Sequence, residues 1–185
     1  MILVTPPVVE PVTLAEIKRQ CVIDSDYDDA LLNAYGLAAR QHVETLCGPL
    51  ITQTWAQYLH AWPFRSVEIR KPRLQEVDSI KYTDSDAVEH TLSESVYLVN
   101  TVSGIVLLVD GQSWPVDVLY QVDPIAITFI CGYGDDPSDV PEPIRIAILM
   151  LCSHWYENRE PVNIGNVVTP LPFAVDALLE NYRHR

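Results

Sequence analysis

Three aspartates spaced two residues apart, Asp24, Asp26 and Asp28, have the residue type and spacing that begin an EF-hand calcium loop. Such a loop also needs a glycine at its sixth position and a glutamate at its twelfth. The chain has Asp29 and Tyr35 at these positions, so the motif is incomplete. The aspartates are instead predicted to cap the N-terminus of the helix that follows and to interact favourably with its dipole.

A histidine and two glutamates, His154, Glu157 and Glu160, follow one another at intervals of three and so share one face of a predicted helix. A metal site could use this group, and a small hydrolase could use His154 with an acid. However, no second histidine follows at the spacing of a zinc-binding helix, and Arg159 lies beside the glutamates. The group is therefore predicted to be a salt-bridged or interface surface, and the hydrolase is the alternative from another class.

The four cysteines, Cys21, Cys47, Cys131 and Cys152, are far apart in the sequence and form no C-x-x-C pair. Zinc and redox sites need a tighter cluster, so the cysteines are predicted to be buried thiols in a reducing cytosol. A contact between Cys21 and Cys47 stays open. The sequence also lacks G-x-S-x-G, phosphate-loop and dinucleotide motifs. These observations predict a protein that is not an enzyme and has no metal or cofactor.

The negative net charge of the chain argues against binding to nucleic acid. The 25 acidic residues outnumber the 12 basic ones, which gives a formal charge of −13 and a pI near 4.6. Binding to DNA phosphates requires clustered Lys and Arg that displace counterions, so specific or tight DNA binding is not expected. This negative charge would suit a surface that DNA must pass closely without adhering to it.

The apolar segments are too short for a membrane protein. The longest strongly apolar stretch, Ile144 to Cys152, contains Arg145 and could not cross a bilayer. Residues 1–11 lack a basic region and are interrupted by prolines, unlike a secretory signal. The chain is therefore expected to be soluble, made in the cytoplasm and without a membrane partner.

Hydrophobic periodicity predicts two helices near the start of the chain. Thr13 and Glu16 have the spacing of a capping box at the start of a short helix. A longer helix is predicted from Tyr27 to Cys47, where apolar residues recur at intervals of three and four. Gly48 and Pro49 follow it, as expected at a helix C-terminus.

A third helix is predicted from Pro143 to Asn158. It is apolar almost all round, so it is expected to be enclosed by its own domain or by neighbouring subunits. Its packing centre is predicted at Ile148, Leu151, Trp155 and Tyr156, with Trp155 buried.

Between these helices the apolar residues no longer recur every 3.6 residues but at every second residue, as in half-buried strands. A strand is predicted at residues 51–60, and a hairpin turn at residues 83–86. Further runs rich in β-branched residues are at 77–82, 96–99, 104–109 and 125–131. The region is predicted to be an antiparallel β lobe of five to seven strands.

The sequence therefore predicts an α+β fold, a mainly helical core with an inserted antiparallel β lobe. Residues 1–50 are assigned to the N-terminal helical part of the core and residues 51–132 to the β lobe. Residues 133–160 form the buried helix that completes the core, and residues 161–185 form a C-terminal arm with a short helix.

Several segments resemble those of phage and prophage head–tail connector (adaptor) proteins, in particular a branch with a β lobe. The similar segments, in chain order, are Pro11–Lys18, Asp28–Leu32, Ala38–Arg40, Val43–Glu44, Gln53–Trp55, Trp62–Pro63, Gly132–Gly134 and His154–Glu160. Together they extend over nearly the whole chain in the order of the family.

This resemblance implies a structural, non-enzymatic subunit of the virion neck, present in the host cytoplasm during assembly. It implies a helical core that packs side by side into a homo-oligomeric ring under the portal protein, and a surface for a tail or head-completion protein. DNA would pass through the ring without specific binding. A head-completion or tail-terminator protein is the alternative, but tail-terminator proteins are usually dominated by sheet.

In related connectors a C-terminal arm commonly reaches the portal, so the resemblance assigns portal docking to this arm. The docking residues are predicted to be Phe173, Leu178, Leu179, Tyr182, Arg183 and Arg185. An arm that packs on its own domain is the alternative, and the sequence leaves it open.

Overall fold

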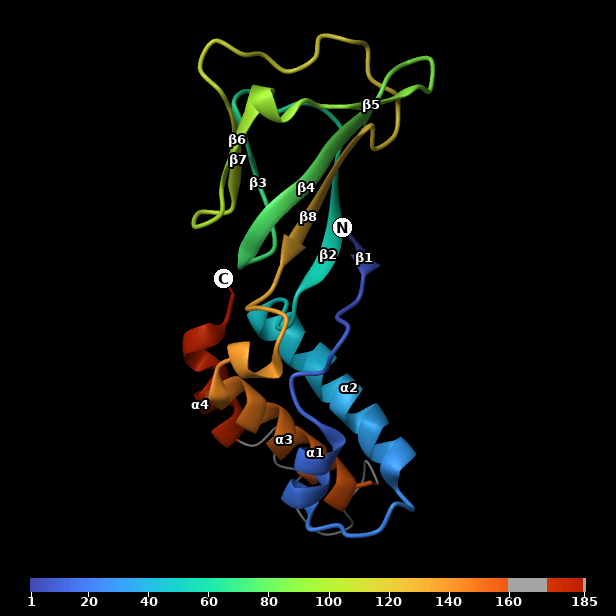
Figure 1. The fold of residues 1–185 in the computed structure, drawn as a ribbon, viewed down its shortest axis with the longest axis vertical. Helices are drawn as coiled ribbons and strands as arrows, with labels where there is room; N and C mark the ends of the chain where they lie inside the picture. The colour runs from blue at the N-terminus through green and yellow to red at the C-terminus, as the bar shows by residue number, and fades with distance from the viewer. Residues whose placement is uncertain (160–172, 185) are drawn as a thin grey trace. The chain divides into compact units, whose positions relative to one another are not determined.

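The computed structural model describes residues 1–159 and 173–184. Contacts divide the chain into two compact units, each of which can be followed in Figure 1. The β unit contains Met1–Pro7 and Thr52–Gly132, and the helical unit lies within Val8–Ile51 and Tyr133–Arg185. None of the described helices is both long and apolar enough to cross a membrane. The predicted α+β fold with a β lobe is confirmed.

The first two helices begin and end close to where local sequence signals place them. Helix α1 (Leu14–Cys21) starts with the predicted capping box, in which the Thr13 hydroxyl accepts from the Glu16 N–H at 3.2 Å. The Glu16 carboxylate accepts in return from the Thr13 N–H at 2.7 Å. Helix α2 (Asp29–Cys47) ends at Gly48, whose φ of 79° is in the left-handed region that favours glycine.

The other helices of this unit follow the β lobe in the sequence. Helix α3 (Glu142–Glu157) has a proline and an acid in its first turn, where a missing N–H costs nothing and a negative charge suits the dipole. Helix α4 (Phe173–Leu179) continues into a 3₁₀ turn at Glu180–Tyr182. Another 3₁₀ turn, Pro137–Asp139, precedes α3.

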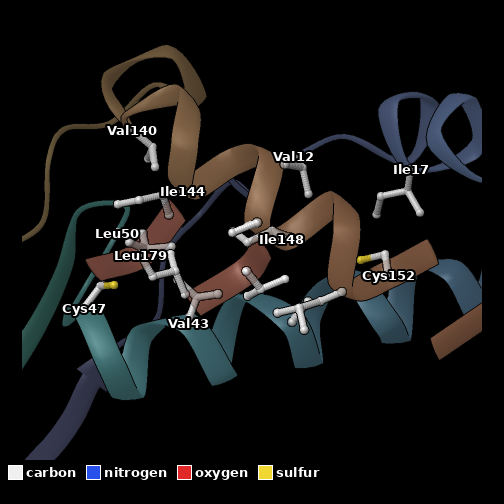
Figure 2. Packing of buried hydrophobic residues seen from close by; sticks show 14 of the residues in the cluster. Val12, Ile17, Val43, Cys47, Leu50, Val140, Ile144, Ile148, Cys152 and Leu179 are labelled. Carbon is white, nitrogen blue, oxygen red and sulfur yellow. The ribbon is translucent and has the colours of Figure 1, made fainter. Parts of the chain in front are cut away.

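The core of the helical unit lies between α2 and α3, with contributions from α1 and α4. Figure 2 shows Ile144 and Ile148 of α3, Val43 of α2 and Leu179 of α4 in one apolar cluster. These four side chains are fully buried. The cluster therefore joins residues from both ends of the chain into one hydrophobic core.

The β unit contains two antiparallel sheets. The five-stranded sheet has the order β1-β2-β8-β4-β5, and the three-stranded sheet has the order β3-β7-β6. The strands are β1 (Ile2–Thr5), β2 (Gln53–Leu59), β3 (Ser66–Glu68), β4 (Leu74–Thr83), β5 (Glu89–Thr91), β6 (Tyr97–Asn100), β7 (Ile105–Leu108) and β8 (Ile125–Cys131). A 3₁₀ turn at Glu94–Val96 leads into β6.

The two sheets share one apolar core, and β8 runs through its centre. Every second residue of β8 is buried, namely Ile125, Ile127, Phe129 and Cys131, as the period of a strand requires. β2 and β4 pair with β8 on either side. Val106 of β7 adds a fully buried side chain from the other sheet.

The N-terminal residues differ from the prediction that assigned residues 1–50 wholly to the helical part. Ile2–Thr5 form β1, which pairs antiparallel with β2 at Ile2↔Ala56 and Leu3↔Trp55. The physical reason is that β2 presents a free edge, whose backbone groups β1 satisfies. No local pattern in the short N-terminal segment indicates this distant partner.

Candidate assembly surfaces of the helical unit

The four residues of the predicted packing centre of α3 differ in burial: two are fully buried and two are only partly buried. Ile148 and Leu151 are fully buried, as expected. Trp155 and Tyr156 are only partly buried, so the prediction that Trp155 is buried is wrong. Trp155 lies in the last turn of α3, where it contacts Tyr35 edge-on at a centroid distance of 6.2 Å. The neighbouring helices therefore cover only part of its ring.

A small polar network joins the end of α3 to the start of α2. The Tyr156 hydroxyl donates to the Asp28 carboxylate at 2.7 Å, and the Arg159 guanidinium donates to the same oxygen at 3.1 Å. Arg159 also lies over the Tyr156 ring, 4.4 Å from its centroid. The hydrogen bond from Tyr156, followed by that from Arg159, holds the pKa of Asp28 below its ordinary value.

This network corrects the predicted role of the aspartates as helix caps. Asp28 occupies the N-cap position of α2, but its side chain makes no capping hydrogen bond. Asp26 pairs with Lys18 at 2.6 Å, and Asp29 pairs with the same ammonium at 2.8 Å. The acidic loop is therefore stabilised by tertiary ion pairs with α1 and α3 more than by capping.

Neither candidate for metal or proton-transfer chemistry forms a site in the described part of the chain. His154 is half-buried, and its Nδ1 lies 3.4 Å from the Asn158 amide nitrogen. Glu157 is exposed, and Glu160 lies outside the described residues. No group of three or more His, Cys, Asp or Glu among residues 1–159 and 173–184 could hold a metal ion.

The cysteines are free thiols. Cys47, Cys131 and Cys152 are buried and Cys21 is half-buried, so the contact between Cys21 and Cys47 that the sequence left open is not a disulfide. Burial, with the nearby Cys21 thiol as a smaller cause, raises the pKa of Cys152 to about 12. Because a thiol must lose its proton to react, Cys152 is a packing residue and not a nucleophile.

The described part of the C-terminal arm packs on the helical unit. Val175 and Leu179 are buried in its core, and the His184 N–H donates to the Leu46 carbonyl at 2.9 Å. Leu179 was predicted to contact a partner, but its side chain is fully enclosed by this chain. The physical reason is that α4 turns its apolar side toward α3, which completes the core.

The other predicted docking residues differ in exposure. Leu178 and Tyr182 are half-buried, and Arg183 is exposed and paired with Asp176 at 2.8 Å. The Phe173 side chain and Arg185 lie outside the described residues. Three of the six predicted residues, Leu178, Tyr182 and Arg183, therefore contribute to a surface that a partner can reach.

Two buried or half-buried arginines were not singled out by the sequence. Arg40 is nearly buried and pairs with both Glu10 and Glu44 at 2.7 Å. Its spacing of four from Glu44 on one helix is a signal that could have revealed the pair. Glu10 is thirty residues away, and no sequence signal connects it with Arg40.

Arg145 links α3 to α1 and to the segment before it. Its guanidinium donates to the carboxylates of Glu16 and Glu142 and to the Pro11 carbonyl. With Arg40, it ties the N-terminal segment of the helical unit to α2 and α3. Both arginines are paired with acids and hold the helices in place.

Comparison with solved structures finds the same fold in chains of gene transfer agent (GTA) particles. A chain in the neck of an empty GTA particle computed with C6 symmetry has a TM-score of 0.79 and 22% identity, covering 100% of this chain and 96% of that one. A chain in the virion of a native GTA particle has a TM-score of 0.76 and 20% identity, covering 99% and 96%. A chain in the neck of a native GTA particle computed with C12 symmetry has a TM-score of 0.75 and 22% identity, covering 100% and 96%.

No curated protein matches the sequence. The match that decides the family extends over residues 11–183, and it is to the phage gp6-like head-tail connector proteins. This range includes both units of the fold, and it agrees with the resemblance found in the sequence. The chain belongs to the family of phage gp6-like head–tail connector proteins.

Proposed function

We propose that the chain is a structural adaptor that assembles as a ring of identical copies between the portal and the tail, so that the DNA channel continues through the ring. The observation that carries this proposal is the family match over both units. The structural neighbours support it, because they come from neck particles computed with C6 and C12 symmetry. Such symmetries are those of a closed ring.

The charge of the chain supports a passive channel. A net charge of −13 repels phosphate, so DNA can slide past without adhering to the ring. We propose that the role is not enzymatic, because the family is one of head–tail connector proteins and, among the described residues, the His154 side chain and carbonyl form their hydrogen bonds with Asn158. The runner-up is a head-completion or tail-terminator protein, whose ring would join the particle at another level of the neck.

The experiment uses heads that contain the portal but lack this chain. The purified chain is added, and negative-stain images are averaged around the portal vertex. We expect an added ring of density at this vertex. Heads without portal are the control and should gain none. Failure of the folded chain to join portal-containing heads would contradict the adaptor role, and joining only at the tail end would favour a tail-terminator.

Portal docking by the C-terminal arm is the finer part of this proposal. Because Val175 and Leu179 belong to the core, deleting the arm would unfold the helical unit and would test nothing. Arg183→Ser removes an exposed base of the arm, and Arg19→Ser removes an exposed base of α1 as the matched control. We expect only Arg183→Ser to weaken joining to portal-containing heads. Equal joining by both variants would exclude Arg183 as an anchor.

A further inference from the structure

The loop between β3 and β4 carries two bases that have no acid as partner. Residues 70–73 have the sequence Arg-Lys-Pro-Arg, and we call them the basic loop. Arg70 is exposed and Lys71 is half-buried, and neither forms an ion pair with any of the described residues. The nearby Arg65 is paired with Asp110, so its charge is already satisfied. The charges of Arg70 and Lys71 are therefore available to a partner.

The basic loop is held in place by β2. The buried Gln57 side chain accepts from the Arg70 N–H at 3.0 Å and donates to the Glu68 carbonyl at 2.9 Å. The Lys71 ammonium lies over the Trp55 ring, 4.1 Å from its centroid. Glu68 is the only acid among residues 65–73. The loop is therefore a fixed surface on which positive charge prevails.

Two exposed acids lie together where β4 ends. Asp86, in the turn between β4 and β5, is exposed and pairs with no base among the described residues. Asp117 is also exposed, and it accepts from the Tyr82 hydroxyl at 3.0 Å. The Ser85 N–H donates to the Val118 carbonyl at 2.8 Å, so the segments that carry the two aspartates lie side by side. We call Asp86 and Asp117 the acidic tip.

The basic loop and the acidic tip cannot neutralise each other within one chain. The loop precedes β4 and the turn with Asp86 follows it, and Figure 1 shows the long strand between them. A strand rises about 3.3 Å per residue, so the ten residues of β4 separate the two surfaces by about 30 Å. This is well beyond the screening length in physiological salt. Residues 82–144 contain no Lys or Arg, and Lys81 is already paired with Glu89. A base for the acidic tip must therefore come from a partner.

A second copy of this chain fits both surfaces. The proposed ring places copies with a net charge of −13 beside one another, so they repel unless bases of one copy meet acids of the next. With the basic loop and the acidic tip at opposite ends of one strand, each copy can use one surface for each of its two neighbours. Such a head-to-tail contact generates a closed ring where the rotation closes.

DNA is a poorer occupant of the basic loop. Binding to duplex DNA depends on counterions released at many basic contacts, and two available bases beside Glu68 are too few. DNA would also leave the acidic tip without a partner, since phosphate repels it. The charges therefore favour a contact between copies.

We propose that the basic loop of one copy docks on the acidic tip of the next copy, and that this contact joins the copies of the ring. The inference rests on the proposed adaptor function. It names the two surfaces through which identical copies meet, and it makes their contact electrostatic. High salt should therefore weaken ring assembly.

The test reverses one charge at a time. Arg70→Glu changes the basic loop, and Asp86→Lys changes the acidic tip. Arg19→Glu and Asp24→Lys change the net charge by the same amounts at exposed positions of the helical unit, so they are the matched controls. Each chain is added at increasing concentration to portal-containing heads without DNA. Negative-stain images give the concentration at which half of the portal vertices carry a ring.

We expect all four variants to melt at the wild-type temperature, because the replaced side chains are exposed and unpaired. Arg70→Glu and Asp86→Lys should each raise the half-assembly concentration by about tenfold or more, whereas the controls should not. The chain that combines Arg70→Glu with Asp86→Lys should recover most of the loss, because each acid again meets a base. An equal mixture of the two single variants should also assemble, since copies can then alternate.

Assembly of Arg70→Glu at the wild-type concentration would overturn the inference and leave the adaptor role intact. A loss that Asp86→Lys does not reverse would also overturn it, because the basic loop would then face the portal. An equal loss for Arg19→Glu would reduce the effect to net charge, and a loss confined to heads filled with DNA would assign the loop to DNA; both results exclude the proposed contact. Failure of the wild-type chain to join heads would instead contradict the adaptor role itself.

Discussion

The helical unit and the β unit differ in how their charged side chains are paired. In the helical unit, basic side chains tie elements together, as Arg40 does with Glu10 and Glu44, and Lys18 with Asp26 and Asp29. In the β unit, no Lys or Arg occurs after Lys81, although acids continue along its loops and strands. The bases of the helical unit therefore join its elements to one another, whereas acids outnumber bases in the β unit and its pairs of Lys81 with Glu89 and Arg65 with Asp110 are exposed.

The two units also differ in their apolar side chains. Most of the exposed large apolar residues in the described chain belong to the β unit, among them Ile2, Phe64 and Val116. In the helical unit, α3 is predicted to be enclosed by its own domain or by neighbouring subunits; its inward residues form the core, and its Ile146 is 40% exposed in the single chain. The helical unit therefore buries most of its large apolar side chains in its own core, whereas the β unit leaves more of them exposed.

The largest effect should come from the core of the helical unit. Leu151→Ala is expected to lower the free energy of unfolding by about 2–5 kcal/mol, because it leaves a cavity at a fully buried position. Chemical denaturation measures the loss. Ile146→Ala on the same helix is the control and should cost less than about 1 kcal/mol. Equal losses would mean that the exposed side of α3 is covered in solution, so the helical unit would not be self-sufficient.

A smaller effect should separate internal from surface ion pairs. Arg40→Met is expected to cost about 2–3 kcal/mol, because it removes the ion pairs of the nearly buried guanidinium with Glu10 and with the half-buried Glu44. The comparison in the β unit is Lys81→Met, which breaks the exposed pair with Glu89 and should not change stability measurably. If the two substitutions changed the free energy of unfolding equally, the buried ion pairs of the helical unit would stabilise the fold no more than the exposed pairs of the β unit.

Trp155→Ala should lower the free energy of unfolding by an amount that shows how far the Trp155 side chain is buried at the end of α3. Loss of partial burial and of the edge contact with Tyr35 is expected to cost about 1–3 kcal/mol in denaturant unfolding. A fully buried tryptophan would cost about 3–5 kcal/mol. A loss at the upper end of that range would show that further residues of the chain cover Trp155, and would restore the packing centre that the sequence predicted.

Features that depend on neighbours in the sequence were predictable. The capping box at Thr13 and the end of α2 at Gly48 follow from residue types at fixed spacings. The strand at 125–131 follows from alternation, and the hairpin between β4 and β5 follows from its polar turn. Local propensity and tertiary structure agree at these positions, which is why a sequence pattern was sufficient.

Features that depend on distant partners were not predictable. Tyr156 and Asp28 form a hydrogen bond across 128 residues, and β1 finds its partner β2 about fifty residues later. Leu179 has the type and spacing of a surface-docking residue, but it is buried because it packs in the hydrophobic core of the helical unit. Periodicity shows which side chains share a face of a helix, but it does not show what that face contacts.

The smallest expected effect is a pH dependence at the network between α2 and α3. The hydrogen bonds from Tyr156 and Arg159 hold the pKa of Asp28 below its ordinary value of 3.8 in the folded chain. A group with a lowered folded pKa stabilises the fold above its unfolded pKa, and this stabilisation is lost as the pH falls through the folded pKa. Asp28→Asn should therefore lower the melting temperature at pH 7, and the difference from wild type should shrink as the pH falls below 3.8 and disappear below the lowered pKa of the folded chain.

Scanning calorimetry across this pH range tests the sign of the effect, with Asp24→Asn as the control because Asp24 is an exposed acid of the same loop. The control should follow the wild-type curve at every pH. A melting difference for Asp28→Asn that stayed constant down to the lowest pH would mean that the asparagine acts through shape or lost hydrogen bonds alone. The ionised carboxylate would then contribute nothing, and the link between α2 and α3 would depend on their apolar contacts without help from charge.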